Sequence, residues 1–209
     1  MLAIAALTSS ALTAYVNVWA ATLFVASKMK ETKKLTISAM TTALGVVFMV
    51  LGAVIQVLDL STATLASLLV VFIYLELGSP YTWLVWLTTS LGAFLLYPGS
   101  LMWLTYLLMF GIYPIVKGYI ERLPRFLWLV LKLVFLNLML VVMVLLSETL
   151  VGVSFFGDVS ELNWLSPQAA YVFLWVLMNV TFILYDKMIV IMVAFYYAKI
   201  RPKIEKLLK

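Results

Sequence analysis

The sequence has 209 residues, of which 66% are hydrophobic and only 11% are charged, with a net charge of +5 and a mean hydropathy of +1.14. A soluble domain has roughly 45–50% apolar and about 25% charged residues. A chain this apolar could not bury its apolar surface if it folded in water. The composition therefore predicts a polytopic membrane protein and excludes a soluble globular domain.

The sequence contains no cysteine and no histidine. Their absence excludes disulfides, thiolate nucleophiles, iron–sulfur centres, and zinc or haem sites that use these ligands. Catalysis would depend on a few carboxylates and lysines, and Glu148, Asp186 and Lys187 are too scattered to form an acid–base site. The sequence also has no Gly-rich phosphate loop. We therefore expect no enzyme activity, no metal site and no cofactor.

A helix that crosses a bilayer needs about 20 apolar residues. Turn residues at Asp59, at 78–80 and at 98–99 separate three short segments. We expect Pro114 to kink the end of the fifth segment and Pro124 to begin the sixth. The predicted fold is an all-α bundle of seven transmembrane helices, at residues 2–27, 34–57, 62–77, 81–97, 101–117, 126–151 and 168–198.

The basic residues predict how the chain crosses the membrane. Twelve of the 14 lie in three clusters, which follow the first segment, separate the fifth from the sixth, and end the chain. With seven spans these clusters share one side, and the positive-inside rule makes that side cytoplasmic. We expect the N-terminus outside and the C-terminus in the cytoplasm. Because the positive charge borders the membrane, anionic lipids explain it and nucleic-acid binding is not expected.

The first segment divides the chain into two parts. It lacks a basic n-region and its apolar run is long, so we expect a spanning helix and not a cleaved signal peptide. Residues 1–30 would form this helix, and residues 31–209 a six-helix membrane domain with a basic cytoplasmic tail. The location expected for such a chain is a prokaryotic cytoplasmic membrane.

Polar side chains at membrane depth are costly, which makes them candidates for a binding site. Asn137 lies near the face of Glu148, and Asn179 shares a face with Asp186. One interpretation is an outward-facing polar pocket between the last two helices, which Trp175 could line. The other is a set of interhelical hydrogen bonds of about 0.6 kcal/mol each. Packing is the simpler explanation for the tryptophan.

Other polar residues have ordinary explanations. Glu76 lies one turn from the turn at 78–80, and Lys132 can extend its amine towards the interface beside Arg125. Asp186 and Lys187 are about 100° apart around their helix, so they do not pair along one face. Structural pairing or a cytoplasmic contact is slightly favoured for both, although Lys187 could also meet an anionic group of a ligand.

The second segment carries a recognisable pattern, Lys33-Lys-Leu-Thr-Ile-Ser-Ala39-Met-Thr-Thr-Ala43-Leu-Gly45. A basic start followed by Ala-x-x-x-Ala resembles the first helix of the substrate-binding S components of energy-coupling factor (ECF) transporters. The resemblance implies that Ala39 and Ala43 contact the coupling helices of the membrane T component. Small residues one turn apart allow such close approach. Six helices from Lys33 onward are also similar to that family.

The resemblance implies a function as well as a fold. An S component binds a vitamin or similar micronutrient, and partner ATPases drive uptake through the T component. Its pocket opens outward and is formed mainly by later helices and outer loops. By position the resemblance brings in the 153–165 loop, and it assigns substrate binding to Asn137, Glu148, Trp175, Asn179 and Lys187.

A second interpretation needs no ligand. The chain could be a non-catalytic accessory or scaffold subunit of a membrane complex, with its small-residue stripes as docking faces and its polar residues as interhelical ties. This role explains the extra first helix more naturally. A channel is not favoured, because no repeated polar stripe runs along several helices.

Overall fold

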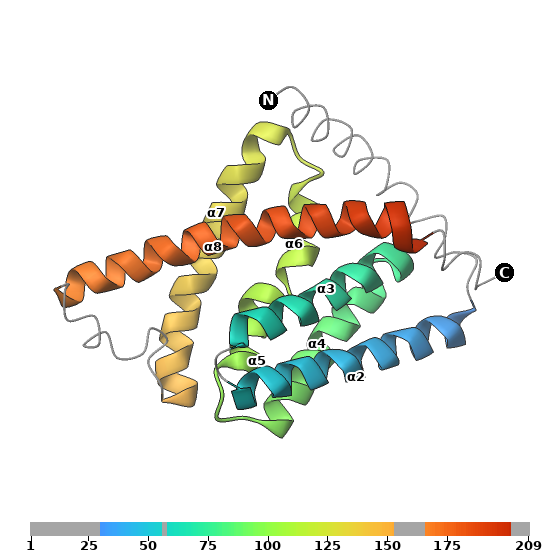
Figure 1. Ribbon diagram of the computed structural model, residues 1–209, viewed down its shortest axis with the longest axis horizontal. Coiled ribbons are helices and arrows are strands. Elements are labelled where there is room, and N and C mark those ends of the chain that lie inside the picture. The colour runs from blue at the N-terminus through green and yellow to red at the C-terminus, as the bar shows by residue number, and fades with distance from the viewer. Residues whose placement is uncertain (1–29, 56–57, 153–165, 202–209) are drawn as a thin grey trace.

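The computed structural model describes residues 30–55, 58–152 and 166–201 (Figure 1). These residues form helices and connecting turns, and no strand occurs among them. The predicted helix at 2–27, the 153–165 loop and most of the basic tail lie outside the described residues. The helices, in chain order, are α2 Glu31–Ile55, α3 Asp59–Leu77, α4 Ser79–Leu96, α5 Met102–Thr105, η1 Tyr106–Phe110, α6 Tyr113–Ile120, α7 Arg125–Leu146, η2 Ser147–Val151, α8 Pro167–Phe195 and η4 Tyr196–Ile200.

Five of the described helical stretches are long and apolar enough to cross a membrane. They are Glu31–Ile55, Asp59–Leu77, Met102–Ile120, Arg125–Leu150 and Gln168–Lys199. Their outward surfaces are apolar, as at Phe126, which is 77% exposed, and Ile191, which is 67% exposed. The described residues therefore confirm an all-helical fold, and the five stretches of spanning length are consistent with a membrane protein, while the count of seven spanning helices and the orientation stay predictions.

Helices α2, α3 and α4 pack closely because small residues line their contacts. A Cβ atom added at Gly52 on α2 would overlap the side chain of Thr62 on α3. One added at Gly45 would lie 3.0 Å from the Thr89 methyl group on α4. Without side chains at these two points, the backbone of α2 can approach both neighbours. A larger residue at position 52 would force the helices apart.

The helical stretch from 102 to 120 is broken in its middle, at residues 106–112, whereas the sequence predicted that Pro114 would kink its end. Pro114 instead lies in the first turn of α6, directly after the break. The Gly111 N–H donates to the Tyr106 carbonyl at 2.8 Å, which is the wider spacing of a π-helix. This shift leaves the Leu107 carbonyl without its usual helical donor. The indole N–H of Trp86 on α4 donates to that carbonyl at 3.1 Å. A side-chain hydrogen bond from α4 therefore satisfies the carbonyl that the break leaves without a donor.

Pro114 frees a second carbonyl, because it has no N–H to donate to Phe110. The Tyr185 hydroxyl on α8 donates to the Phe110 carbonyl at 3.2 Å. The same hydroxyl is hydrogen-bonded to Ser67 on α3. Tyr185 thus joins three helical segments at the centre of the apolar core, where its ring also packs against Tyr113 and Phe110.

Helices α7 and α8 cross each other in Figure 1. Pro124 immediately precedes α7, as expected for a residue that lacks an N–H group. Ser166 begins α8 by accepting a hydrogen bond from the Ala169 N–H, which satisfies one free donor of the first turn. Most polar residues singled out in the sequence lie on these two helices, whereas Glu76 lies on α3 and Glu148 in the η2 turn after α7.

Candidate functional site

Three of the predicted site residues meet where α7 and α8 cross. The Asn137 amide donates to the Asn179 side-chain oxygen at 3.0 Å and to the Leu133 carbonyl at 2.8 Å. The Trp175 indole N–H donates to the Asn137 side-chain oxygen at 2.7 Å. Asn179 also donates to the Trp175 carbonyl at 3.0 Å. These groups hydrogen-bond one another, which is the arrangement expected of an interhelical tie.

Asn137→Ala is expected to reduce the free energy of unfolding by about 1–2 kcal/mol, because the Trp175 indole and the Asn179 amide would each lose a partner. The measurement is denaturant unfolding in mixed micelles. Thr149→Ala, at an exposed position where α7 ends, is the matched control and should change stability by less than about 0.5 kcal/mol. Equal stability of N137A and the control would contradict the interhelical role.

The other two predicted site residues do not join this cluster. Glu148 lies in the π-helical turn that ends α7, and it is exposed. Lys187 lies on α8 beside a separate cavity of about 260 Å³. The five predicted substrate-binding residues are therefore spread over three places in the described bundle.

The predicted partner-interface residues lie on the outside of α2. Ala39 and Ala43 are both exposed, whereas the buried face of this helix consists of other residues, including Ser38, Thr41 and Gly45. Met40 on the same side is 69% exposed. In the described part of the chain no helix covers this apolar face. A docking role requires such an uncovered face.

A different cavity has the composition of a small-molecule site. It measures about 220 Å³ and lies between the start of α3, the turn before α5, the η1 segment and the middle of α8. None of the five predicted residues lines it. Its walls are mainly apolar and aromatic, with Met102, Met109, Phe110, Met178, Phe182 and Tyr185 among them.

The polar groups of this cavity are few, and one of them is not satisfied. The hydroxyl of Thr105 donates to the Leu101 carbonyl, and that of Ser100 accepts from the Met102 N–H. The Asp59 oxygen Oδ1 is buried and has no hydrogen-bond partner in the described part of the chain. A buried acceptor without a donor is unfavourable, so a ligand that donates a hydrogen bond would complete this site.

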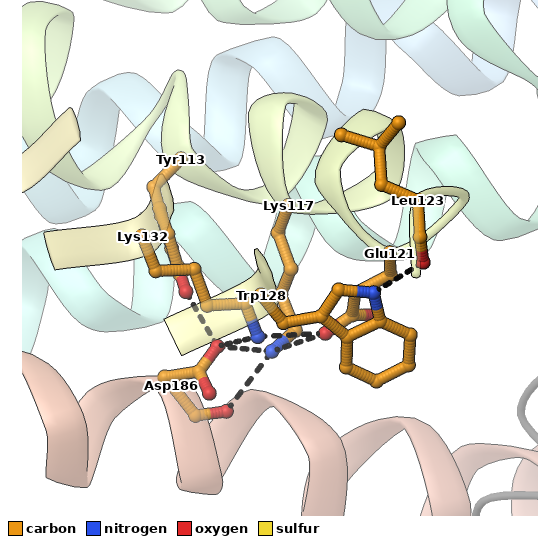
Figure 2. A network of polar contacts seen from close by, with 7 residues as sticks. All are labelled: Tyr113, Lys117, Glu121, Leu123, Trp128, Lys132 and Asp186. Carbon is orange, nitrogen blue, oxygen red and sulfur yellow. Dashed lines mark hydrogen bonds and ion pairs between the residues drawn. The ribbon is translucent and has the colours of Figure 1, made fainter. Parts of the chain in front are cut away.

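A buried ionic network joins α6, α7 and α8 (Figure 2). The Lys132 amine lies 2.8 Å from Glu121 Oε1 and 2.9 Å from Asp186 Oδ1. The Lys117 amine lies 3.0 Å from the same Glu121 oxygen and also pairs with Asp186. The Tyr113 hydroxyl donates to Asp186. All four ionic side chains are largely buried, from 1% exposed for Lys117 to 15% for Asp186.

The network balances its own charge, since two lysines face two carboxylates. Balanced, hydrogen-bonded charges can be buried, whereas an unpaired one in the same place would be costly. The prediction that the Lys132 amine extends to the interface is wrong, because Glu121 and Asp186 both lie within ion-pair distance of it. The structural pairing favoured for Asp186 is confirmed. Its partners come from two other helices and not from Lys187.

One feature of the sequence points to this network. Lys117 and Glu121 are four residues apart, a spacing that places both on one helix face. The apolar pattern alone predicts that the fifth segment ends at Lys117 and groups this lysine with the cytoplasmic cluster. In the structure α6 continues to Ile120, which carries Lys117 into the bundle.

Comparison with known proteins adds no relative, because no family model, no curated protein and no solved structure matches the chain. Among the described residues, no group of three acidic side chains is placed to hold a metal ion. The candidate functional features of the described residues are the apolar cavity beside Asp59, the ionic network and the exposed α2 face.

Proposed function

We propose that the chain is the membrane-embedded substrate-binding subunit of an uptake transporter, of the ECF S-component type. It would bind a vitamin or similar micronutrient, and a T component with partner ATPases would energise uptake. The observation that carries this proposal is the cavity of about 220 Å³ next to the unsatisfied Asp59 oxygen. Apolar and aromatic walls with a few polar groups are typical of small-molecule sites.

The cavity also constrains the ligand. Its size suits a small molecule with a largely apolar body. The free Asp59 acceptor favours a ligand with an N–H or O–H donor, or with a cationic group, at one end. In the orientation predicted from the basic residues, the Asp59 end of the bundle faces outside. The substrate would then enter from the exterior, as in an S component.

The exposed Ala39 and Ala43 face supports the second half of the proposal. A subunit of this type must dock on its T component through a flat surface, and two alanines one turn apart supply one. Docking and ligand binding would then use separate parts of the molecule, since neither alanine lines the cavity.

Ala39→Trp is therefore expected to abolish transport and to leave ligand binding intact, because the indole would obstruct docking without reaching the cavity. Transport is measured as uptake by cells that express the chain with its partners, and binding as ligand retained by the purified protein. Leu138→Trp, at a 56% exposed position on α7, is the matched control and should transport normally. Normal transport by A39W would overturn the assignment of this face.

The accessory-subunit interpretation has an observation of its own. Asn137, Trp175 and Asn179 satisfy one another across α7 and α8, which is what interhelical ties would do. Under this alternative the cavity beside Asp59 stays empty in the native membrane. The presence or absence of a bound small molecule therefore distinguishes the two functions.

A further inference from the structure

We propose that the second cavity, between α7 and α8, binds the phosphate group of an anionic phospholipid. This cavity measures about 260 Å³, and Arg125, Trp128, Lys132, Asp186 and Lys187 are among the residues that line it. The proposed transport function does not require this site. The lipid site is inferred from positive charges at this cavity that have no counter-charge among the described residues.

The imbalance follows from the ionic network. Lys132 and Asp186 point into the cavity region but are already paired within the balanced network. Arg125 and Lys187 are exposed, and neither forms an ion pair within the described residues. Two positive charges at the cavity are therefore left without a counter-charge. An anion between them would supply it.

The surroundings favour a lipid over a soluble anion. Both helices are long and apolar enough to cross a membrane, and Lys187 lies within the apolar stretch of α8. Exposed apolar side chains flank the cavity, including Leu129 at 59% and Ile183 at 38% exposure. A phospholipid would place its phosphate between the two cations and its acyl chains along these side chains. Basic pockets between transmembrane helices bind anionic headgroups in this way.

One wall of the cavity is held in place. The Trp128 indole N–H donates to the Leu123 carbonyl at 2.7 Å, which fixes the ring at the start of α7 (Figure 2). Lys132 lies 5.8 Å from the centre of that ring. The cavity therefore combines a fixed aromatic wall with two free cations, and tryptophan is a residue that favours the headgroup region of a bilayer.

The test measures binding of phosphatidylglycerol and phosphatidylcholine to the full-length protein by native mass spectrometry from detergent. We expect the anionic lipid to be retained and the zwitterionic lipid to be lost. The double variant R125Q/K187Q should weaken phosphatidylglycerol binding by at least about tenfold. The double variant K30Q/K33Q, at two exposed lysines outside the cavity, is the charge-matched control and should change binding less than about twofold.

Two further measurements distinguish a specific binding site from an effect of misfolding or of lost charge. R125K/K187R keeps both charges and should retain the lipid, and all variants should elute as the parent does on size exclusion. Equal retention of the two lipids, or normal phosphatidylglycerol binding by R125Q/K187Q, would overturn the site. Binding of inorganic phosphate without binding of phosphatidylglycerol would overturn the lipid as its ligand.

Discussion

Asp186→Asn is expected to reduce the free energy of unfolding by about 3–5 kcal/mol, because it removes one carboxylate from a buried network and leaves an excess positive charge there. The two lysines would then share Glu121 alone, at 3.0 Å from Lys117 and 2.8 Å from Lys132. The measurement is reversible denaturant unfolding in mixed micelles. Glu148→Gln, which removes an exposed carboxylate, is the matched control and should stay within about 0.5 kcal/mol of the parent.

A double variant tests whether the charge imbalance causes the loss. D186N/K132M removes one charge of each sign and keeps the Lys117–Glu121 pair. Its destabilisation should be clearly smaller than the sum of the two single effects, with a coupling energy of about 1–3 kcal/mol. Strict additivity, or a D186N variant as stable as E148Q, would contradict the account of the network.

The second large effect is expected at the cavity beside Asp59. Thr181 lines this cavity, and Thr181→Trp would fill much of its volume of about 220 Å³. If the parent co-purifies with a small molecule, as the proposed function requires, this variant is expected to lose it. Loss is measured by mass spectrometry of the extracted protein. Leu184→Trp lies on the same helix at a 66% exposed position outside the cavity, and it should retain the ligand.

A milder change at the same cavity tests the role of the free acceptor. Asp59→Asn keeps the shape of the side chain and removes its charge, so the ligand should be held at least about tenfold more weakly if it donates to this oxygen. Full retention of the ligand by both T181W and D59N would show that it binds elsewhere.

The helices could be predicted because their signals are local. Apolar runs, separated by turn residues at Asp59, at 78–80 and at 98–99, place the described helices within a few residues of their observed ends. A disturbance at Pro114 was expected, since a proline removes one backbone donor wherever it occurs, but the break lies before Pro114 and not at the end of the segment. The meeting of Asn137 and Asn179 agrees with the interhelical hydrogen bonds that were one of the two interpretations of these asparagines.

The ionic network and the cavity could not be predicted in the same way. They depend on which helices become neighbours, and an apolar run contains little information about its partners in a bilayer. Asp186 meets lysines that precede it by 69 and 54 residues in the chain. The cavity is lined by residues from the start of α3, from 100–110 and from α8, which lie far apart in the sequence.

The central claim, a substrate-binding subunit, is tested most directly by purifying the chain in mild detergent from its native membrane. Mass spectrometry then identifies both the co-purifying proteins and any small molecules. We expect a T-type membrane subunit with ATPases, and a small, largely apolar ligand that is lost in T181W. A stable complex with unrelated membrane subunits and no ligand would contradict the claim and establish the accessory-subunit function.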